Sequence, residues 1–304
     1  MGAGTLPVTV GVQFAHASLQ ALAEDDGVDL LHIKGPAVDT SLLALREPDG
    51  DQPDDVAEPV PRHSVDADVL VRPSHVERLI DAMQRHHWTT LYRFEDGSAF
   101  EHATTMTHPF LALVDVHRRF PGIGGDAEAA FDRLWSDRHS TTIGGYPCAV
   151  PSVTAQRLVL IVHAARGGRL DHTDIRRSWT EATDEERAAV QRLADDVGAE
   201  VALAAGTGRL NEYEGAQDHA LWLALATGES ATPRVWWARV RAAPTWRAAL
   251  RTSVRLLVPN PHRMEVTLGR PPTSRELGRA YVDRARWGGR ELWRMVRERS
   301  GRRR

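Results

Sequence analysis

Hydrophobic and polar positions divide the chain into a mixed first half and a helical second half. Apolar residues at helical spacing predict helices over 8–25, 36–46, 73–87 and 126–138. Short apolar runs predict strands at 30–34 (LLHIK), 67–71 (ADVLV), 88–94 (WTTLYRF) and 110–117 (FLALVDVH). From about residue 152 helical patterns follow one another, at 153–166, 184–206, 216–227, 233–257 and 274–300. We therefore expect an α/β core over 1–150 and a helical domain over 151–304.

One segment interrupts this pattern. Residues 47–61 (EPDGDQPDDVAEPVP) are rich in proline and acid, which predicts a mobile loop between a helix and a strand. The loop is either a lid over a site or an insertion without function.

Composition changes the picture only a little. The chain has 304 residues, of which 42% are hydrophobic and 26% charged, as in an ordinary globular protein. Its single cysteine, Cys148, excludes an internal disulfide and a cysteine-based zinc site, and fits a reducing cytoplasm. Neither a signal peptide nor an apolar run of about 18 residues is present, so we expect a cytoplasmic protein without a transmembrane segment.

Charge is distributed unevenly. The formal net charge is −3, but the segment from Arg241 onward has 17 arginines against 5 acidic residues. This basic end predicts a C-terminal helix that contacts RNA or another anionic surface, or one that neutralises the acidic body of its own chain.

The stretch LLHIKGPAV contains Lys34, the only lysine in the chain. Every other basic side chain apart from histidine is an arginine, which suggests that Lys34 occupies a position where a compact ammonium is needed, for instance to bind a phosphate. The other interpretation is chance.

Asp66 and Asp68 lie two residues apart in the predicted strand of RHSVDADVLV, so both carboxylates point to one face. Asp115 lies in a second apolar strand, where a carboxylate needs a partner or a task. If the two strands are neighbours, the three carboxylates converge and predict a Mg²⁺ site. The alternative is a strand whose acids face solvent.

Together these motifs resemble the family of uncharacterised nucleotidyltransferases in the polymerase-β-like superfamily. The resemblance rests on Lys34-Gly35, then R-x-S-x-D-x-D from Arg62 to Asp68, then D-x-H at Asp115 and His117. It implies an α+β fold, in which a small mixed sheet with flanking helices precedes a mainly helical C-terminal half. Abortive-infection and toxin-type nucleotidyltransferases share the first two motifs.

The resemblance also implies roles for these residues. Asp66, Asp68 and Asp115 would be catalytic and would bind Mg²⁺, with two ions expected. Lys34, Gly35, Arg62 and Ser64 would bind the NTP, Gly35 at a helix N-terminus that receives phosphate. Pro36 departs from the family pattern, because it removes one backbone donor.

Two histidines have open roles. His117 is either near the substrate or a core histidine, and His163, on the helix 153–166, either faces the cleft or packs in the core.

The expected activity is Mg²⁺-dependent transfer of a nucleoside monophosphate from an NTP to a hydroxyl or similar acceptor, with release of pyrophosphate. The acceptor would be a small molecule, a peptide or RNA. Two alternatives stay open: a toxin-type enzyme that modifies tRNA, and a nucleotidyltransferase fold retained as a non-catalytic binding module.

Overall fold

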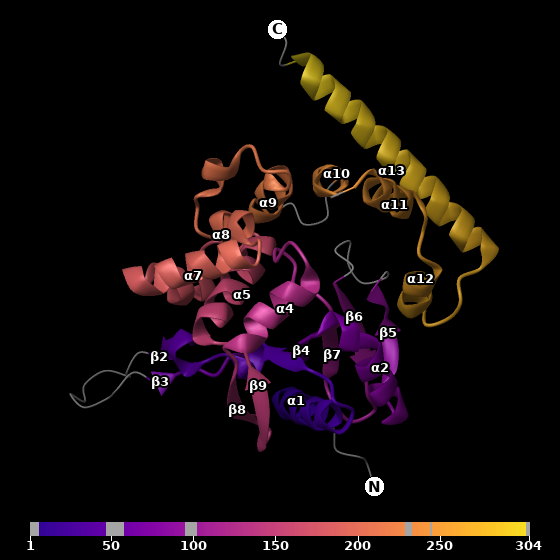
Figure 1. Ribbon diagram of the computed structural model, residues 1–304. Helices are drawn as coiled ribbons and strands as arrows, with labels where there is room; N and C mark the ends of the chain where they lie inside the picture. The colour runs from indigo at the N-terminus through magenta and orange to yellow at the C-terminus, as the bar shows by residue number, and fades with distance from the viewer. Residues whose placement is uncertain (1–5, 47–57, 95–101, 229–232, 244, 302–304) are drawn as a thin grey trace.

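A five-stranded mixed sheet forms the centre of the first half of the chain (Figure 1). The computed structural model describes residues 6–46, 58–94, 102–228, 233–243 and 245–301. In spatial order, the strands of the sheet are β1 (Leu30–Ile33), β4 (Asp66–Val71), β7 (Leu113–His117), β6 (Ala103–Thr107) and β5 (Thr89–Tyr92). β4 and β7 run parallel, whereas the other neighbouring strands run antiparallel.

Helices surround this sheet and make up the second half of the chain. They are α1 (Val8–Asp25), α2 (Val76–Arg85), α4 (Ala127–Ser136), α5 (Val153–Arg166), α6 (Thr173–Ile175), α7 (Asp184–Asp196), α8 (Glu200–Gly206), α9 (His219–Ala226), α10 (Pro233–Ala242), α11 (Trp246–Leu257), α12 (Pro261–Leu268) and α13 (Ser274–Gly301). Short turns of 3₁₀ helix are η1 (Gly35–Ala37), η2 (Thr40–Leu42), η3 (Pro73–His75) and η5 (Leu210–Tyr213), and η4 (Arg176–Thr180) is a turn of π-helix. None of the described helices combines the length and the hydropathy that crossing a bilayer requires.

The alternation of side chains in β4 divides the core in two. Val69 and its neighbours of the same parity pack with α1 and α2 on one face of the sheet. Leu70 points to the other face and packs in a second core with Phe131 of α4 and Leu158 of α5. Asp66 and Asp68 have the parity of Leu70, so strand geometry directs their carboxylates to the α5 face.

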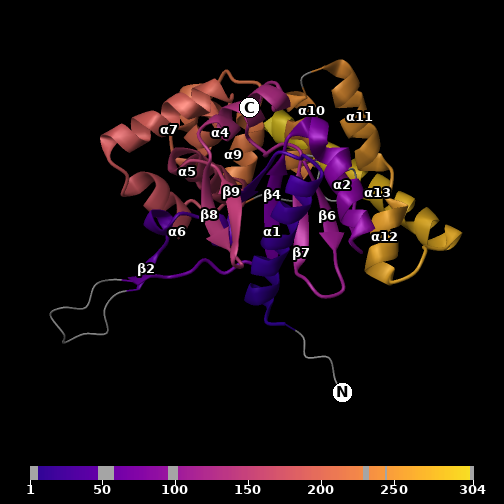
Figure 2. The ribbon, with the colours of Figure 1, turned by 60° about the horizontal axis from the view of Figure 1, so that its bottom comes forward.

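Two small hairpins flank the sheet. β2 (Leu45–Arg46) pairs with β3 (Glu58–Pro59), and β8 (His139–Ile143) pairs with β9 (Tyr146–Val150). The second hairpin lies beside α1 (Figure 2), where Ala149 donates its N–H to the Gln20 side chain at 3.1 Å. Its turn approaches α1 so closely that a Cβ on Gly144 would come within 2.7 Å of the Gln13 carbonyl oxygen.

The α+β class, the mixed sheet and the helical C-terminal region expected from the sequence are confirmed. The predicted helices at 8–25, 73–87, 126–138 and 153–166 are present, and Asp126 is the N-cap of α4, where its carboxylate accepts the N–H of Ala129 at 2.9 Å. The four predicted strands are also present as β1, β4, β5 and β7. The division into domains at residue 150 stays a prediction.

Several predicted boundaries are wrong. The segment 36–46 is not a helix: η1 and η2 replace it, because Pro36 removes a donor and the Asp39 carboxylate accepts the N–H of Ser41 at 2.9 Å. The predicted helix 184–206 is two helices, separated at Gly198 with φ of +62°. Helix 233–257 is likewise divided into α10 and α11. Of the predicted loop 47–61, residues 47–57 lie outside the described part of the chain.

Candidate active site

Asp68 and Asp115 lie directly opposite each other on the parallel strands β4 and β7. The two residues are register partners, so their side chains share one face, and His117 follows two residues later on the same face. Ligand atoms of Asp68, Asp115 and His117 all lie within 4.8 Å of one another. The strands that carry Asp68 and Asp115 are therefore neighbours, which was the condition set by the sequence analysis. Their pairing brings two of the three predicted carboxylates together.

Asp68 is the most tightly held of these groups. Its Oδ1 lies 2.6 Å from the Lys34 ammonium and 2.8 Å from Nε2 of His117. Burial alone would raise the pKa of the Asp68 carboxyl, but the Lys34 charge and the His117 hydrogen bond outweigh it and hold the pKa well below its usual range. Asp68 is thus a buried carboxylate that stays ionised.

Asp66 stands at the start of β4, outside the compact group of three. Its carboxylate accepts a hydrogen bond from the Ser64 hydroxyl at 3.1 Å. Burial raises the pKa of Asp66, and the charges of Asp68 and Asp115 raise it further. Because three carboxylates repel one another across this space, a bound cation would relieve the repulsion.

Strand β6, the antiparallel neighbour of β7, positions the side chain of Asp115. The Thr105 hydroxyl of β6, its register partner, donates to Oδ1 of Asp115 at 2.6 Å. The half-buried carboxylate therefore has a fixed orientation and keeps oxygen lone pairs for a further ligand.

The Lys34–Gly35 turn at the end of β1 has an unusual backbone. Lys34 has φ of +62° and ψ of −174°, and Gly35 has φ of +51°. Such a conformation is costly for a lysine and marks a position that the surroundings enforce. A Cβ on Gly35 would meet the Ser64 Cβ at 3.1 Å, so the first and second sequence motifs touch here. Gly35 begins a 3₁₀ turn and not an α-helix, which corrects the expectation of a helix N-terminus for phosphate.

A pocket of ≈ 530 Å³ opens beside these residues. Its polar lining includes Lys34, Gly35, Arg62, Ser64, Asp66, Asp68, His163, Arg169, His172 and Asp174, and its apolar lining includes Leu42, Leu43, Ala44, Val60 and Pro61. The structure thus places all four residues predicted to bind the NTP around one cavity, together with two of the predicted metal ligands.

Arg62 and His163, both predicted at the site, have different surroundings. The Arg62 guanidinium forms an ion pair with the buried carboxylate of Asp174. His163 lines the pocket, and burial lowers its pKa to about 2, with the Lys34 charge as the next cause. Within the described part of the chain, Nδ1 of His163 has no hydrogen-bond partner. His163 therefore faces the cleft as a neutral imidazole.

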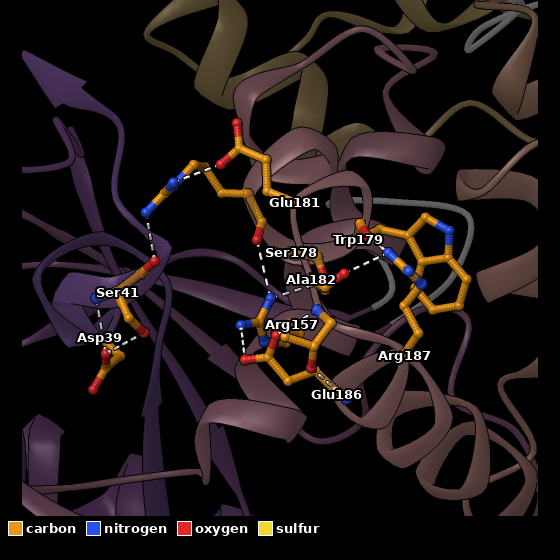
Figure 3. A network of polar contacts seen from close by, with 11 residues as sticks. Asp39, Ser41, Arg157, Ser178, Trp179, Glu181, Ala182, Glu186 and Arg187 are labelled. Atoms are coloured by element: carbon orange, nitrogen blue, oxygen red, sulfur yellow. Dashed lines mark hydrogen bonds and ion pairs between the residues drawn. The ribbon is translucent and has the colours of Figure 1, made fainter. Parts of the chain in front are cut away.

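Figure 3 shows a polar network around Arg157, next to the segment that contributes Leu42 and Leu43 to the pocket. The buried Arg157 donates to the carbonyl oxygens of Arg177 and Ser178, at 3.0 and 3.2 Å, and forms an ion pair with Glu186. Arg177 in turn donates to the Ser41 carbonyl oxygen at 2.8 Å. The network joins the π-turn η4 to the η2 segment that carries Leu42 and Leu43.

Sequence reasoning missed the groups behind His117. The His102 ring lies 5.2 Å from the His117 ring, and the Arg166 guanidinium lies 3.2 Å from Nε2 of His102. Burial lowers the pKa of His102 to about 2, with the charges of His117 and Arg166 adding to it. No local signal marks these residues, because Arg166 and His102 are brought together across 64 positions of sequence.

A buried, ionised carboxylate paired with Asp115 across parallel strands, next to a pocket that Lys34 and Arg169 line, is an arrangement that could hold a metal ion. A family described as "uncharacterised nucleotidyltransferase" matches residues 53–214, and the chain belongs to this family.

Among solved structures, the crystal structure of the lincosamide antibiotic adenylyltransferase LnuA with bound lincomycin matches at 14% identity and a TM-score of 0.30. The match covers 59% of this chain and 94% of that one. No curated protein matches.

Proposed function

We propose that this nucleotidyltransferase moves a nucleoside monophosphate from an NTP to a hydroxyl acceptor, releasing pyrophosphate with the help of Mg²⁺. The observation that carries the proposal is the pairing of Asp68 with Asp115 across β4 and β7, at the edge of the pocket that holds Lys34 and Gly35. The acceptor hydroxyl would attack the α-phosphorus, and the bond from that phosphorus to the pyrophosphate oxygen would break.

The donor set fits a divalent cation. Asp68 and Asp115 are carboxylates held close together, and burial together with their charges raises the pKa of Asp66, so a cation would balance the negative charge of this group. Asp66, Asp68 and Asp115 would hold the metal, and His117 would orient Asp68 through its hydrogen bond. When bound, two Mg²⁺ ions would stabilise the negative charge on the attacking and leaving oxygens.

The pocket supports binding of the rest of the nucleotide. Lys34 and Arg169 place positive charge in it, as a triphosphate requires, and Leu42, Leu43 and Val60 offer an apolar wall for the base. Arg62, paired with Asp174, would shape this wall and keep part of its donor capacity for phosphate. Asp115, oriented by Thr105, would accept the proton of the acceptor hydroxyl.

Asp68→Asn tests the site without knowledge of the acceptor. In the wild type, Mg²⁺ with an NTP should raise the unfolding temperature, since ligand at a hundredfold excess over Kd stabilises by about 2.7 kcal/mol. Asp68→Asn should lose this Mg²⁺-dependent shift, and Asp184→Asn, which changes a fully exposed aspartate on α7, should keep it. A full shift in Asp68→Asn would contradict the assignment.

The acceptor is then sought with α-labelled NTP. Label on a tRNA-sized species would favour the toxin-type alternative, whereas label on a small molecule or peptide would favour a biosynthetic role. Metal-dependent binding of every NTP with no transfer to any fraction would favour the non-catalytic binding module.

A further inference from the structure

Helix α11 exposes a row of large apolar side chains. Trp246 is 71% exposed, Leu250 56% and Val254 50%, and Val258, directly after the helix, is 42% exposed. Residues four apart lie on one side of a helix, so these side chains form a continuous stripe. Large apolar groups left in water in this arrangement indicate a surface that meets another apolar phase.

Arginines accompany the stripe. Arg247 and Arg251 are exposed, and the Arg247 guanidinium lies 5.4 Å from the centre of the Trp246 ring. An amphipathic helix with tryptophan and leucine on one side and arginine beside them is typical of helices that lie in a membrane interface.

Helix α13 repeats the combination. Val282 is 48% and Trp293 61% exposed, and eleven residues of helix separate them by a rotation of only about 20°. Exposed arginines adjoin them, at positions Arg275, Arg279, Arg286 and Arg290. α13 crosses α11 on the outside of the molecule (Figures 1 and 2), and Arg284 connects the two by donating to the Val258 carbonyl oxygen at 2.5 Å. We call the exposed residues of these two helices the α11–α13 surface.

The partner must present negative charge directly beside an apolar layer. RNA offers phosphates and base faces but nothing that accommodates Leu250 and Val254. A second copy packed through the same surface would bring arginines against arginines, because a two-fold interface apposes like residues. An anionic lipid bilayer supplies both layers, with headgroups for the arginines and acyl chains for the stripe.

We propose that the α11–α13 surface is a peripheral docking site for an anionic lipid bilayer. This surface lies outside the pocket that would bind the nucleotide, so the membrane proposal does not depend on the proposed reaction.

Vesicle sedimentation with the full-length protein tests this proposal. Vesicles of phosphatidylcholine and phosphatidylglycerol in equal parts should retain the protein, and vesicles of phosphatidylcholine alone should not. Raising NaCl from about 0.1 to about 1 M should release it, since the screening length falls from about 10 to about 3 Å. Leu250→Glu/Val254→Glu should weaken retention about tenfold or more, because it removes two apolar insertions and adds repulsion.

A matched control separates the surface from general effects of charge. Phe110→Glu/Leu223→Glu adds the same two charges at apolar residues that are 75% and 49% exposed elsewhere, and it should bind like the wild type. Both double variants should keep the wild-type melting temperature and any Mg²⁺-dependent nucleotide shift.

Four results would overturn the proposal. These are no binding to anionic vesicles, equal binding to both vesicle types, binding to a single-stranded RNA oligonucleotide in place of vesicles, and a dimer in light scattering that Leu250→Glu/Val254→Glu dissociates.

Discussion

Lys34 places its positive charge directly against the carboxylate of Asp68. Its ammonium lies 2.6 Å from Asp68 Oδ1, with only 10% of its side chain exposed, and a divalent ion on the same carboxylate would have to share or displace it. The strained backbone of Lys34 shows that the fold holds the lysine at this point. Lys34 would then move from the carboxylate toward phosphate when metal and nucleotide enter.

Lys34→Met tests this exchange. Removing one partner of a buried ion pair leaves Asp68 uncompensated, so we expect the free energy of unfolding to fall by about 3 kcal/mol in metal-free buffer. Mn²⁺ should restore more stability to the variant than it adds to the wild type, because no ammonium competes for Asp68. Urea unfolding with EDTA and with Mn²⁺ measures both effects. Equal Mn²⁺ stabilisation of the two proteins would show that Lys34 and the metal do not compete.

At the scale of residues, the sequence predicted which residues lie at the site better than it predicted the contacts between them. Lys34, Gly35, Ser64, Asp66 and Asp68 were identified from spacing and resemblance, and they line one pocket. The pairing of Arg62 with Asp174 was not predicted, because 112 positions separate the two residues and only tertiary packing brings them together.

At the scale of elements, the site depends on segments that are short and irregular. Long amphipathic helices are visible in a sequence because many residues repeat one period. β6 (ATTMT) and β8 (HSTTI) were missed because threonine and serine dominate them, and β9 (YPCAV) because Pro147 interrupts its apolar run. The pocket wall at Leu42 and Leu43 adjoins η2, which is held by hydrogen bonds to the Asp39 carboxylate and from the Arg177 guanidinium of η4. Such contacts leave no periodic pattern in the sequence.

Arg157→Leu should loosen that wall. The buried guanidinium serves two carbonyl oxygens and Glu186, so its loss should cost about 2–4 kcal/mol of unfolding free energy and weaken nucleotide binding. Arg176→Leu is the matched control, since Arg176 is 56% exposed in its ion pair with Glu181 and should cost about 1 kcal/mol or less. Chemical denaturation of both variants measures the difference. Similar losses of unfolding free energy would show that the buried contacts of Arg157 do not stabilise the fold more than an exposed ion pair does.

For the whole molecule, buried histidines connect stability to pH. Burial lowers the pKa of His16 to about 4 and those of His102 and His163 to about 2, and it holds the pKa of His32 well below its usual range. Below about pH 6.5 the unfolded chain takes up protons at these residues and the folded chain does not, so stability falls as pH falls. For His16, this loss continues until the pH reaches its folded pKa of about 4.

His16→Gln should flatten this dependence. One histidine that is protonated only in the unfolded state contributes a slope of about 1.4 kcal/mol per pH unit, so the variant should lose about that much slope between about pH 6 and pH 4.5. Gln retains polar atoms near His32, whose Nδ1 lies 2.8 Å from that of His16. Urea unfolding across this pH range measures the slope, and an unchanged slope would mean that His16 is already protonated in the folded chain.

The identity of Lys34 as the only lysine turns the ion pair with Asp68 into a reporter. Reductive methylation of amines would label one side chain in the whole protein besides the terminal amine. That methyl signal in an NMR spectrum would report directly from the site. Its rate of labelling would show when the ammonium leaves the carboxylate, so titrations with ions and candidate acceptors become readable without any turnover assay.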